Sequence, residues 1–85
     1  MREFVEYLVK NIVNDPNQVD IRMKEDPRGN LIEIRVAPED IGKVVGKGGK
    51  VIRSLRTLVI SIGVRIGMRV HLEIIQENSY AHAGN

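Results

Sequence analysis

The apolar positions in the first half of the chain predict a helix followed by a β-hairpin. Between Glu3 and Val13, apolar residues recur three and four positions apart, which is typical of an amphipathic helix. Asp15-Pro16 then ends the helix, because proline has no backbone N–H and restricts the residue before it. Apolar and polar residues alternate over 19–24 and 30–37 around a turn signal at 26–30, so we predict two antiparallel strands with one buried face.

The second half of the chain predicts two more helices and a third strand. Pro38 can begin a short helix over residues 38–45, which Gly46 interrupts. Helical spacing returns over residues 50–66, with Gly67 as the end of this helix and Gly63 as a weak point within it. Its core stripe is expected at Leu55, Leu58, Val59, Ile62 and Ile66. Residues 68–76 alternate as a strand, and residues 77–85 are expected to form a flexible C-terminal tail.

These elements give the order αββααβ and an α+β fold. A right-handed crossover through two helices makes strands 30–37 and 68–76 parallel neighbours, with the hairpin partner antiparallel on the other edge. The resulting three-stranded mixed sheet can carry all three helices on one face. The other face is expected to be mostly polar and in contact with water; its residues would be Leu31, Glu33, Arg35, His71 and Glu73.

Length and composition narrow the class of protein. A chain of 85 residues can bury about 60–65% of its unfolded surface, which suffices for one domain with a single core. There is no cysteine, which excludes disulfides and thiolate chemistry and favours a reducing compartment, so we expect a cytoplasmic protein. Charges interrupt the first 15 residues, so they resemble neither a signal peptide nor a spanning helix, and the protein is expected to be soluble.

The charge is distributed unevenly along the chain. Residues 1–40 carry six basic and nine acidic side chains, and residues 71–85 carry two acidic ones. Residues 41–70 carry seven basic side chains and no acid: Lys43, Lys47, Lys50, Arg53, Arg56, Arg65 and Arg69. This acid-free stretch suits a polyanion such as a nucleic acid, although a solvated helix face or an anionic membrane surface is compatible with the same charge.

The glycines in this stretch do not match nucleotide-binding loops. Gly49-Lys50 is followed by Val51 instead of the hydroxyl residue of a Walker A loop, and Val44 stands where its first glycine belongs. In a dinucleotide fingerprint the third glycine would fall on Val51. What remains is a GxxG turn between two helices over residues 46–49. Such a turn can approach a sugar-phosphate backbone closely while the N–H groups of the next helix face the phosphates.

The run from Val45 to Ile52 resembles the hydrophobic-Gly-x-x-Gly-x-x-Ile signature of KH domains. The order αββααβ resembles the type II KH topology, and a chain of this length resembles the small bacterial KH proteins of the KhpA type. The resemblance covers residues 1–76 as one KH domain and includes Asp15-Pro16 and the string from Val36 to Gly49. Residues 60–66 depart from it, because they are more apolar than the family pattern.

The resemblance implies a set of RNA-binding residues. KH modules clamp about four single-stranded nucleotides with the GxxG loop. The residues that would hold the RNA backbone are Gly46, Lys47, Gly48 and Gly49, flanked by Lys43, Lys50 and Arg53. The apolar wall of the groove would be Val44, Val45 and Ile52, with Ile34 or Val36. No aromatic residue lies near the loop in the sequence, so the resemblance predicts modest affinity.

The same resemblance implies partners and a cellular role. It implies an RNA chaperone or post-transcriptional regulator that pairs with itself or with a larger KhpB-like KH protein and affects cell-envelope growth, hence cell shape and cell wall biogenesis. Ile60 and Val64 lie four residues apart and off the predicted core stripe, so they are candidates for a dimer interface. Two alternatives stay open: single-stranded DNA as the ligand, and a protein-interaction module that uses this apolar seam.

No pattern in the sequence indicates an enzyme. His71 and His82 are the only histidines, and no motif joins them to paired carboxylates, so neither a metal site nor a catalytic triad is expected. Glu39 and Asp40 are explained by the positive end of the short helix. We therefore expect a binding protein without a cofactor.

Overall fold

The structure is a computed structural model that describes residues 1–76. The helices are α1 (Arg2–Lys10), α2 (Ile41–Val45) and α3 (Lys50–Ile66), and the strands are β1 (Asp20–Asp26), β2 (Gly29–Arg35) and β3 (Val70–Ile74). Single turns of 3-10 helix occupy Pro16–Gln18, Pro38–Asp40 and Lys47–Gly49. The predicted order αββααβ and the α+β class are confirmed. The tail predicted at 77–85 lies outside the described residues.

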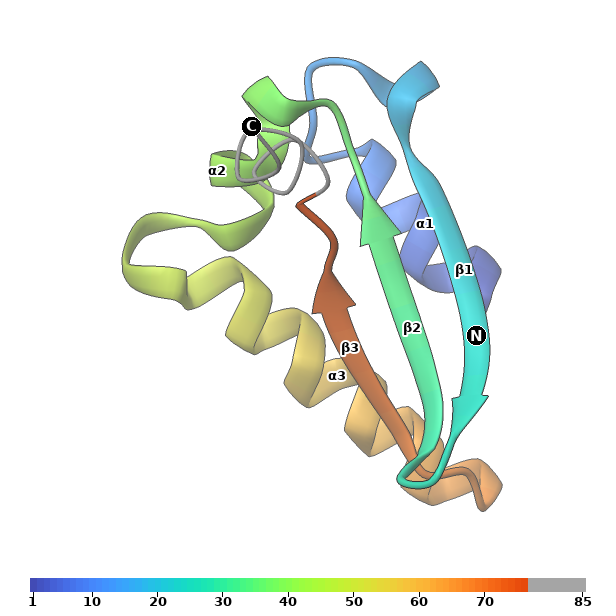
Figure 1. Ribbon diagram of the computed structural model, residues 1–85. Coiled ribbons are helices and arrows are strands. Elements are labelled where there is room, and N and C mark those ends of the chain that lie inside the picture. The colour runs from blue at the N-terminus through green and yellow to red at the C-terminus, as the bar shows by residue number, and fades with distance from the viewer. Residues whose placement is uncertain (77–85) are drawn as a thin grey trace.

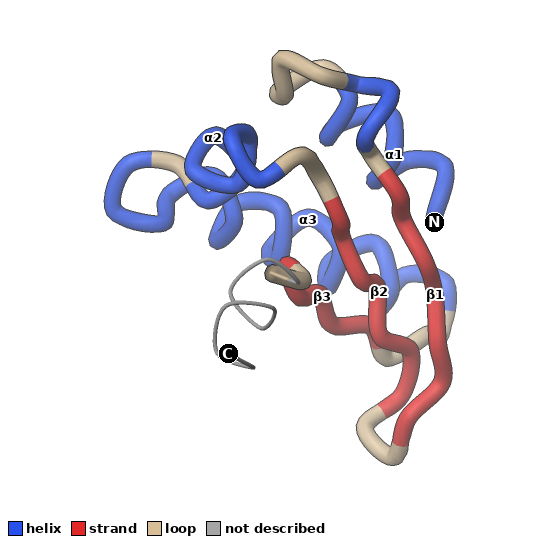
Figure 2. Tube along the Cα trace, turned by 45° about the horizontal axis from the view of Figure 1, so that its top comes forward, coloured by secondary structure: helices blue, strands red, loops and turns tan. Residues whose placement is uncertain are grey.

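The sheet has the predicted topology. Its strand order is β1-β2-β3, with β1 antiparallel to β2 and β3 parallel to β2. Figures 1 and 2 show the helices on one face of this three-stranded sheet, with α3 running beside β3 and α1 beside β1. In the register, Ile34 lies opposite Ile21, and Ile32 lies opposite both Met23 and Leu72. The alternation of apolar residues therefore sets one buried face, as expected for strands of period two.

The core lies between this sheet face and the helices. Its buried members are aliphatic: Val5, Val9, Ile21, Ile32, Ile34, Val44, Ile52, Leu55, Val59, Val70 and Leu72. The predicted stripe on α3 is partly wrong, because Leu58 is 46% and Ile66 57% exposed. The buried face of α3 instead follows Ile52, Leu55, Val59 and Gly63, at the three- and four-residue steps of one helix face.

Gly63 is the point where α3 packs most closely against the start of β3. A Cβ atom at this position would lie 2.7 Å from the carbonyl oxygen of Met68 and 3.1 Å from a methyl group of Val70. The helix runs through Gly63 without a break, and the Gly63 carbonyl accepts the N–H of Met68 at 2.8 Å. The absence of a side chain is therefore what lets the chain turn back from α3 into β3.

Two helix boundaries differ from the predicted ones. The first helix ends at Lys10, because Asn11 caps it: its side-chain Nδ2 donates to the Tyr7 carbonyl at 2.8 Å. The helix predicted over 38–45 is a 3-10 turn, Pro38–Asp40, followed by α2. Sequence patterns alone made both predicted helices longer than the observed ones, because they do not show where local hydrogen bonds end a helix or tighten it into a 3-10 turn.

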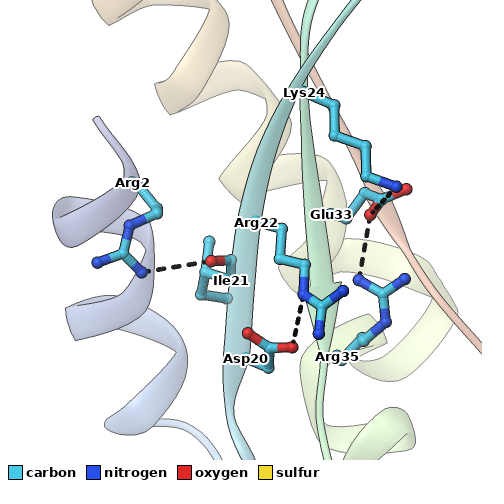
Figure 3. Close-up of polar contacts among 7 residues, drawn as sticks. All are labelled: Arg2, Asp20, Ile21, Arg22, Lys24, Glu33 and Arg35. Carbon is cyan, nitrogen blue, oxygen red and sulfur yellow. Dashed lines mark hydrogen bonds and ion pairs between the residues drawn. The ribbon is translucent and has the colours of Figure 1, made fainter.

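The open face of the sheet is less hydrated than predicted at its centre. Glu33 is buried, because Lys24 and Arg35 cover its carboxylate with contacts of 3.3 and 3.1 Å (Figure 3). Burial acts to raise the pKa of Glu33, but the hydrogen bonds from Arg35 and Lys24 outweigh it, so the pKa is lowered. At the edge of the sheet, Arg2 donates to the Ile21 carbonyl at 3.3 Å, which ties α1 to β1 (Figure 3).

Candidate nucleic-acid interface

The segment between α2 and α3 has a backbone that glycine adopts most easily. Gly46, Gly48 and Gly49 have φ angles of +78°, +62° and +77°. The Gly46 N–H ends α2 by donating to the Gly42 carbonyl at 2.8 Å, and the Gly49 N–H closes the turn onto the Gly46 carbonyl at 3.0 Å. We call residues 46–49 the glycine loop; in Figure 1 it stands out from the body between α2 and α3.

The space around the glycine loop is tight at its first glycine and open at its second. A Cβ atom at Gly46 would lie 2.4 Å from a Val51 methyl group and 2.8 Å from the Val51 backbone nitrogen. At Gly48, nothing lies within 4 Å of the corresponding position. The loop is therefore packed against the first turn of α3 on one side and accessible on the other.

The predicted apolar wall is mostly internal. Val44 is fully buried and Ile52 nearly so, and Ile34 is buried in the sheet, so these three side chains belong to the core. Val45 and Val36 are partly exposed and pack against the edge of the core. Of the predicted wall, these last two residues offer apolar surface to a ligand.

Basic side chains border the glycine loop. Lys43, Lys47 and Lys50 are exposed, and within residues 1–76 none of them forms an ion pair. Gly49 is the N-cap of α3 and provides no side-chain hydrogen bond to its first turn. The Lys50 N–H donates to the Lys47 carbonyl within the loop. The positive end of α3 and the three ammonium groups favour an anion at the same place.

The arginines of α3 differ from these lysines, because two of them bind backbone carbonyls. Arg53 Nη1 donates to the Gly48 carbonyl at 2.8 Å, and Arg56 Nε donates to the Leu72 carbonyl at 3.3 Å. An open groove of about 710 Å³ runs along the exposed side of α3 next to the loop, and it is lined by Lys50, Arg53, Ser54, Thr57 and Leu58.

Asp40 binds the segment that follows α1 to the turn that precedes α2. The sequence analysis did not predict this contact. It is 2% exposed, and its two carboxylate oxygens accept the backbone N–H groups of Asn14 and Asp15 at 3.1 and 3.0 Å. The segment after α1 is thereby fixed to the turn that leads into α2 and the glycine loop. The sequence shows only an acidic residue two positions after Pro38, and no local pattern links it to Asn14 and Asp15.

The candidate dimer residues lie at the other end of α3. Ile60 is 50% and Val64 74% exposed, as expected for positions off the core stripe. With Met68, Arg69 and Val70 they line a groove of about 360 Å³ between the end of α3 and the start of β3.

His71 pairs with a carboxylate of the sheet. His71 Nε2 lies 3.0 Å from Asp26 Oδ2 across the sheet, and His82 lies outside the described residues. Residues 1–76 contain no group of three or more side chains that could hold a metal ion. In the same part of the chain, no helix is both long and apolar enough to cross a membrane.

Comparison with known proteins identifies the family. The family model of the KhpA/KhpB KH domain matches residues 2–74. RNA-binding protein KhpA of Chlamydia pneumoniae is 42% identical over 77 residues, which cover 91% of this chain and 99% of that protein. RNA-binding protein KhpA of Streptomyces coelicolor is 46% identical over 72 residues, covering 85% of this chain and 90% of that protein. The αββααβ fold, the glycine loop and these similarities together show that the chain belongs to the KhpA/KhpB KH-domain family.

Proposed function

We propose that this protein binds single-stranded RNA by holding its backbone on the glycine loop. The observation that carries the proposal is the loop itself, with three glycines at positive φ beside three unpaired lysines and an uncapped helix start. Glycines allow a phosphate to approach the backbone without Cβ atoms, and helix N–H groups can then donate to it. The relatives carry the name RNA-binding protein, and membership of this KH family makes the protein a binding module and not an enzyme.

The parts of the proposed interface have different roles. The exposed ammonium groups of Lys43, Lys47 and Lys50 neutralise phosphates, and Val36 and Val45 offer aliphatic surface to the bases. Val44 and Ile52, being buried, act by supporting the loop. Without aromatic stacking, which is worth about 1–3 kcal/mol per base, one module is expected to bind with modest affinity.

Replacing Lys47 with glutamate tests this interface. Lys47→Glu reverses a charge on the loop, and Arg65→Glu makes the same change on exposed α3 surface about 22 Å or more along the helix, so it serves as the matched control. Fluorescence anisotropy with a labelled single-stranded RNA octamer should show that the affinity of the wild type for RNA falls as the salt concentration rises. Lys47→Glu should lower this affinity by at least about tenfold, and Arg65→Glu should leave it unchanged. If Lys47→Glu binds as well as the wild type, the loop is not the binding site.

The choice of nucleic acid is decided in the same assay. Duplex RNA should bind worse than the single strand, because its bases are not accessible to a narrow surface. A DNA octamer of the same sequence compares the two single-stranded ligands, since the 2′-hydroxyl is the group by which proteins distinguish them. Equal binding of DNA would identify the ligand as single-stranded nucleic acid in general.

Membership of the family supports a wider proposal. The protein, with residues 1–76 as its KH domain, would act in the cytoplasm as an RNA chaperone or post-transcriptional regulator, together with a KhpB-like partner, and affect cell-envelope growth. RNA crosslinking in cells followed by sequencing tests this role. Recovery of no RNA above the level of a Lys47→Glu control would refute it.

Pairing of two KH domains is supported by the exposed seam of Ile60 and Val64. A second copy, or the KhpB-like partner, would cover this seam and join two weak RNA sites, which raises avidity through effective concentration. Changing both residues to lysine should give a folded monomer, because neither side chain belongs to the core. Leu58→Lys, exposed but outside the seam, should leave the dimer intact. Analytical ultracentrifugation at tens of micromolar decides this, and a monomeric wild type would refute self-pairing.

A further inference from the structure

The peptide that joins Gly48 to Gly49 is held at both of its ends. Its N–H, on Gly49, donates to the Gly46 carbonyl at 3.0 Å. Its carbonyl, on Gly48, accepts Nη1 of Arg53 at 2.8 Å from one turn into α3. Because a peptide unit is planar, these two contacts fix the orientation of the whole unit in the middle of the loop.

Gly49 leaves the space that the Arg53 guanidinium occupies. A Cβ atom at Gly49 would lie 3.1 Å from Nη1 of Arg53, closer than an unstrained contact. The glycine and the arginine are therefore complementary in shape as well as joined by a hydrogen bond. A bond from a guanidinium to a carbonyl is also stronger than one between two neutral groups.

We propose that Arg53 is a positioning residue that holds the glycine loop in its binding conformation, and that it is not a phosphate contact. The inference rests on the proposed function of the loop and deepens it. Three lysines around the loop have no partner within residues 1–76, whereas Nη1 of Arg53 already donates to a carbonyl of the loop itself.

The loop needs such a contact because its sequence provides little stiffness. Gly48 has open space around it, and glycine has more accessible backbone conformations than any other residue. A loop that is ordered before the ligand arrives spares part of the ordering cost of binding. Arg53 can order the loop because it lies on α3, and the buried side chains of Ile52 and Leu55 fix this helix to the core.

The first arm of the test uses the free protein. Arg53→Met replaces the aliphatic stem of arginine with an unbranched apolar chain and removes the guanidinium donor. Arg65→Met is the control with the same loss of charge on the same helix. Amide hydrogen exchange measured by NMR should be about fivefold faster at Gly49 in Arg53→Met than in the wild type, and unchanged in Arg65→Met. Unchanged exchange at Gly49 in Arg53→Met would overturn the proposal.

The second arm measures RNA affinity against salt for the wild type, Arg53→Met and Lys50→Met. Loss of one phosphate contact lowers the slope of log affinity against log salt by about 0.7 for a single strand. Lys50→Met should show this change, whereas Arg53→Met should bind severalfold more weakly at every salt concentration with the wild-type slope. A slope reduced to the Lys50→Met value would show that Arg53 contacts phosphate and overturn the proposal. A wild type that binds no RNA would refute the proposed function alone, and the exchange at Gly49 would still decide whether Arg53 holds the loop.

Discussion

Replacing Gly46 with alanine tests the geometry of the glycine loop most directly. Gly46 has φ +78° and ψ 168°, a combination that is essentially restricted to glycine and costs about 1–3 kcal/mol for other residues. The new methyl group would lie 2.4 Å from a Val51 methyl group and 2.8 Å from the Val51 backbone nitrogen. Carbon atoms prefer about 3.5–4.0 Å, so the start of α3 must move, at a cost of about 1–3 kcal/mol for overpacking.

Gly48→Ala is the matched control, because it makes the same chemical change in the same loop. Its φ of +62° and ψ of 20° are left-handed helical, which costs about 1–2 kcal/mol, and no atom lies within 4 Å of the added methyl group. Both substitutions gain about 0.4–1 kcal/mol from a less flexible unfolded chain. We therefore expect Gly46→Ala to lower the free energy of unfolding by about 3 kcal/mol and Gly48→Ala by about 1 kcal/mol.

Urea unfolding followed by far-UV circular dichroism measures both values. For a domain of this size, 1 kcal/mol corresponds to about 4–8 °C in Tm, so Gly46→Ala should lose about 12–24 °C. Equal losses for the two variants would show that Val51 does not confine Gly46. A Gly46→Ala protein as stable as the wild type would refute the loop conformation itself.

Three further substitutions test the supports of the site. Gly63→Ala should destabilise the domain by about 1–3 kcal/mol in urea unfolding, because its methyl group would lie 2.7 Å from the Met68 carbonyl oxygen; a gain of about 1 kcal/mol, as helix propensity alone predicts, would contradict this packing. Asp40→Asn should cost about 1.5–3 kcal/mol in the same assay, because an amide has one acceptor oxygen for the two N–H groups of Asn14 and Asp15; an unchanged midpoint would contradict these bonds. Since the pKa of Glu33 is lowered from its usual 4.5 in the folded protein, its carboxylate stabilises the fold above that pH and loses this effect as the pH falls through the folded pKa. Glu33→Gln should therefore be less stable than the wild type at pH 7 and lose less stability between pH 5 and 3, and parallel pH profiles would contradict the assignment.

Local patterns predicted the elements better than the contacts between them. Residues 50–66 were predicted as a helix and form α3, because long apolar periodicity and Gly67 at a left-handed C-cap both act within the element. The exposure of Leu58 and Ile66 was not predicted, since many stripes fit one periodic helix and the sheet selects among them. Gly63 was predicted to weaken the helix for the same reason. Its role is to allow close packing against Met68, a residue beyond the end of the helix.

In the candidate site, too, local features were predicted from the sequence and long-range contacts were not. The position of the glycine loop followed from the sequence, because a GxxG turn between helices is a local signal. The burial of Val44 and Ile52 and the anchoring by Asp40 depend on segments far apart in the chain, such as Asn14 and α2. No spacing rule connects such segments, and only the packed fold shows that they meet.

The fold also narrows the set of side chains that are expected to contact phosphate at the loop. Seven basic side chains lie between residues 41 and 70, and if each contacted a phosphate the salt slope for a single strand would be about −5. Arg53 and Arg56 donate to backbone carbonyls, and Arg65 lies about 22 Å along α3 from Lys50, with Arg69 beyond it at the start of β3. Three lysines remain beside the loop, and three phosphate contacts correspond to a slope of about −2. If the loop binds RNA as proposed, the number of phosphate contacts is therefore expected to depend on where the fold places each cation and on what its N–H groups already bind, and not on the net charge of the chain.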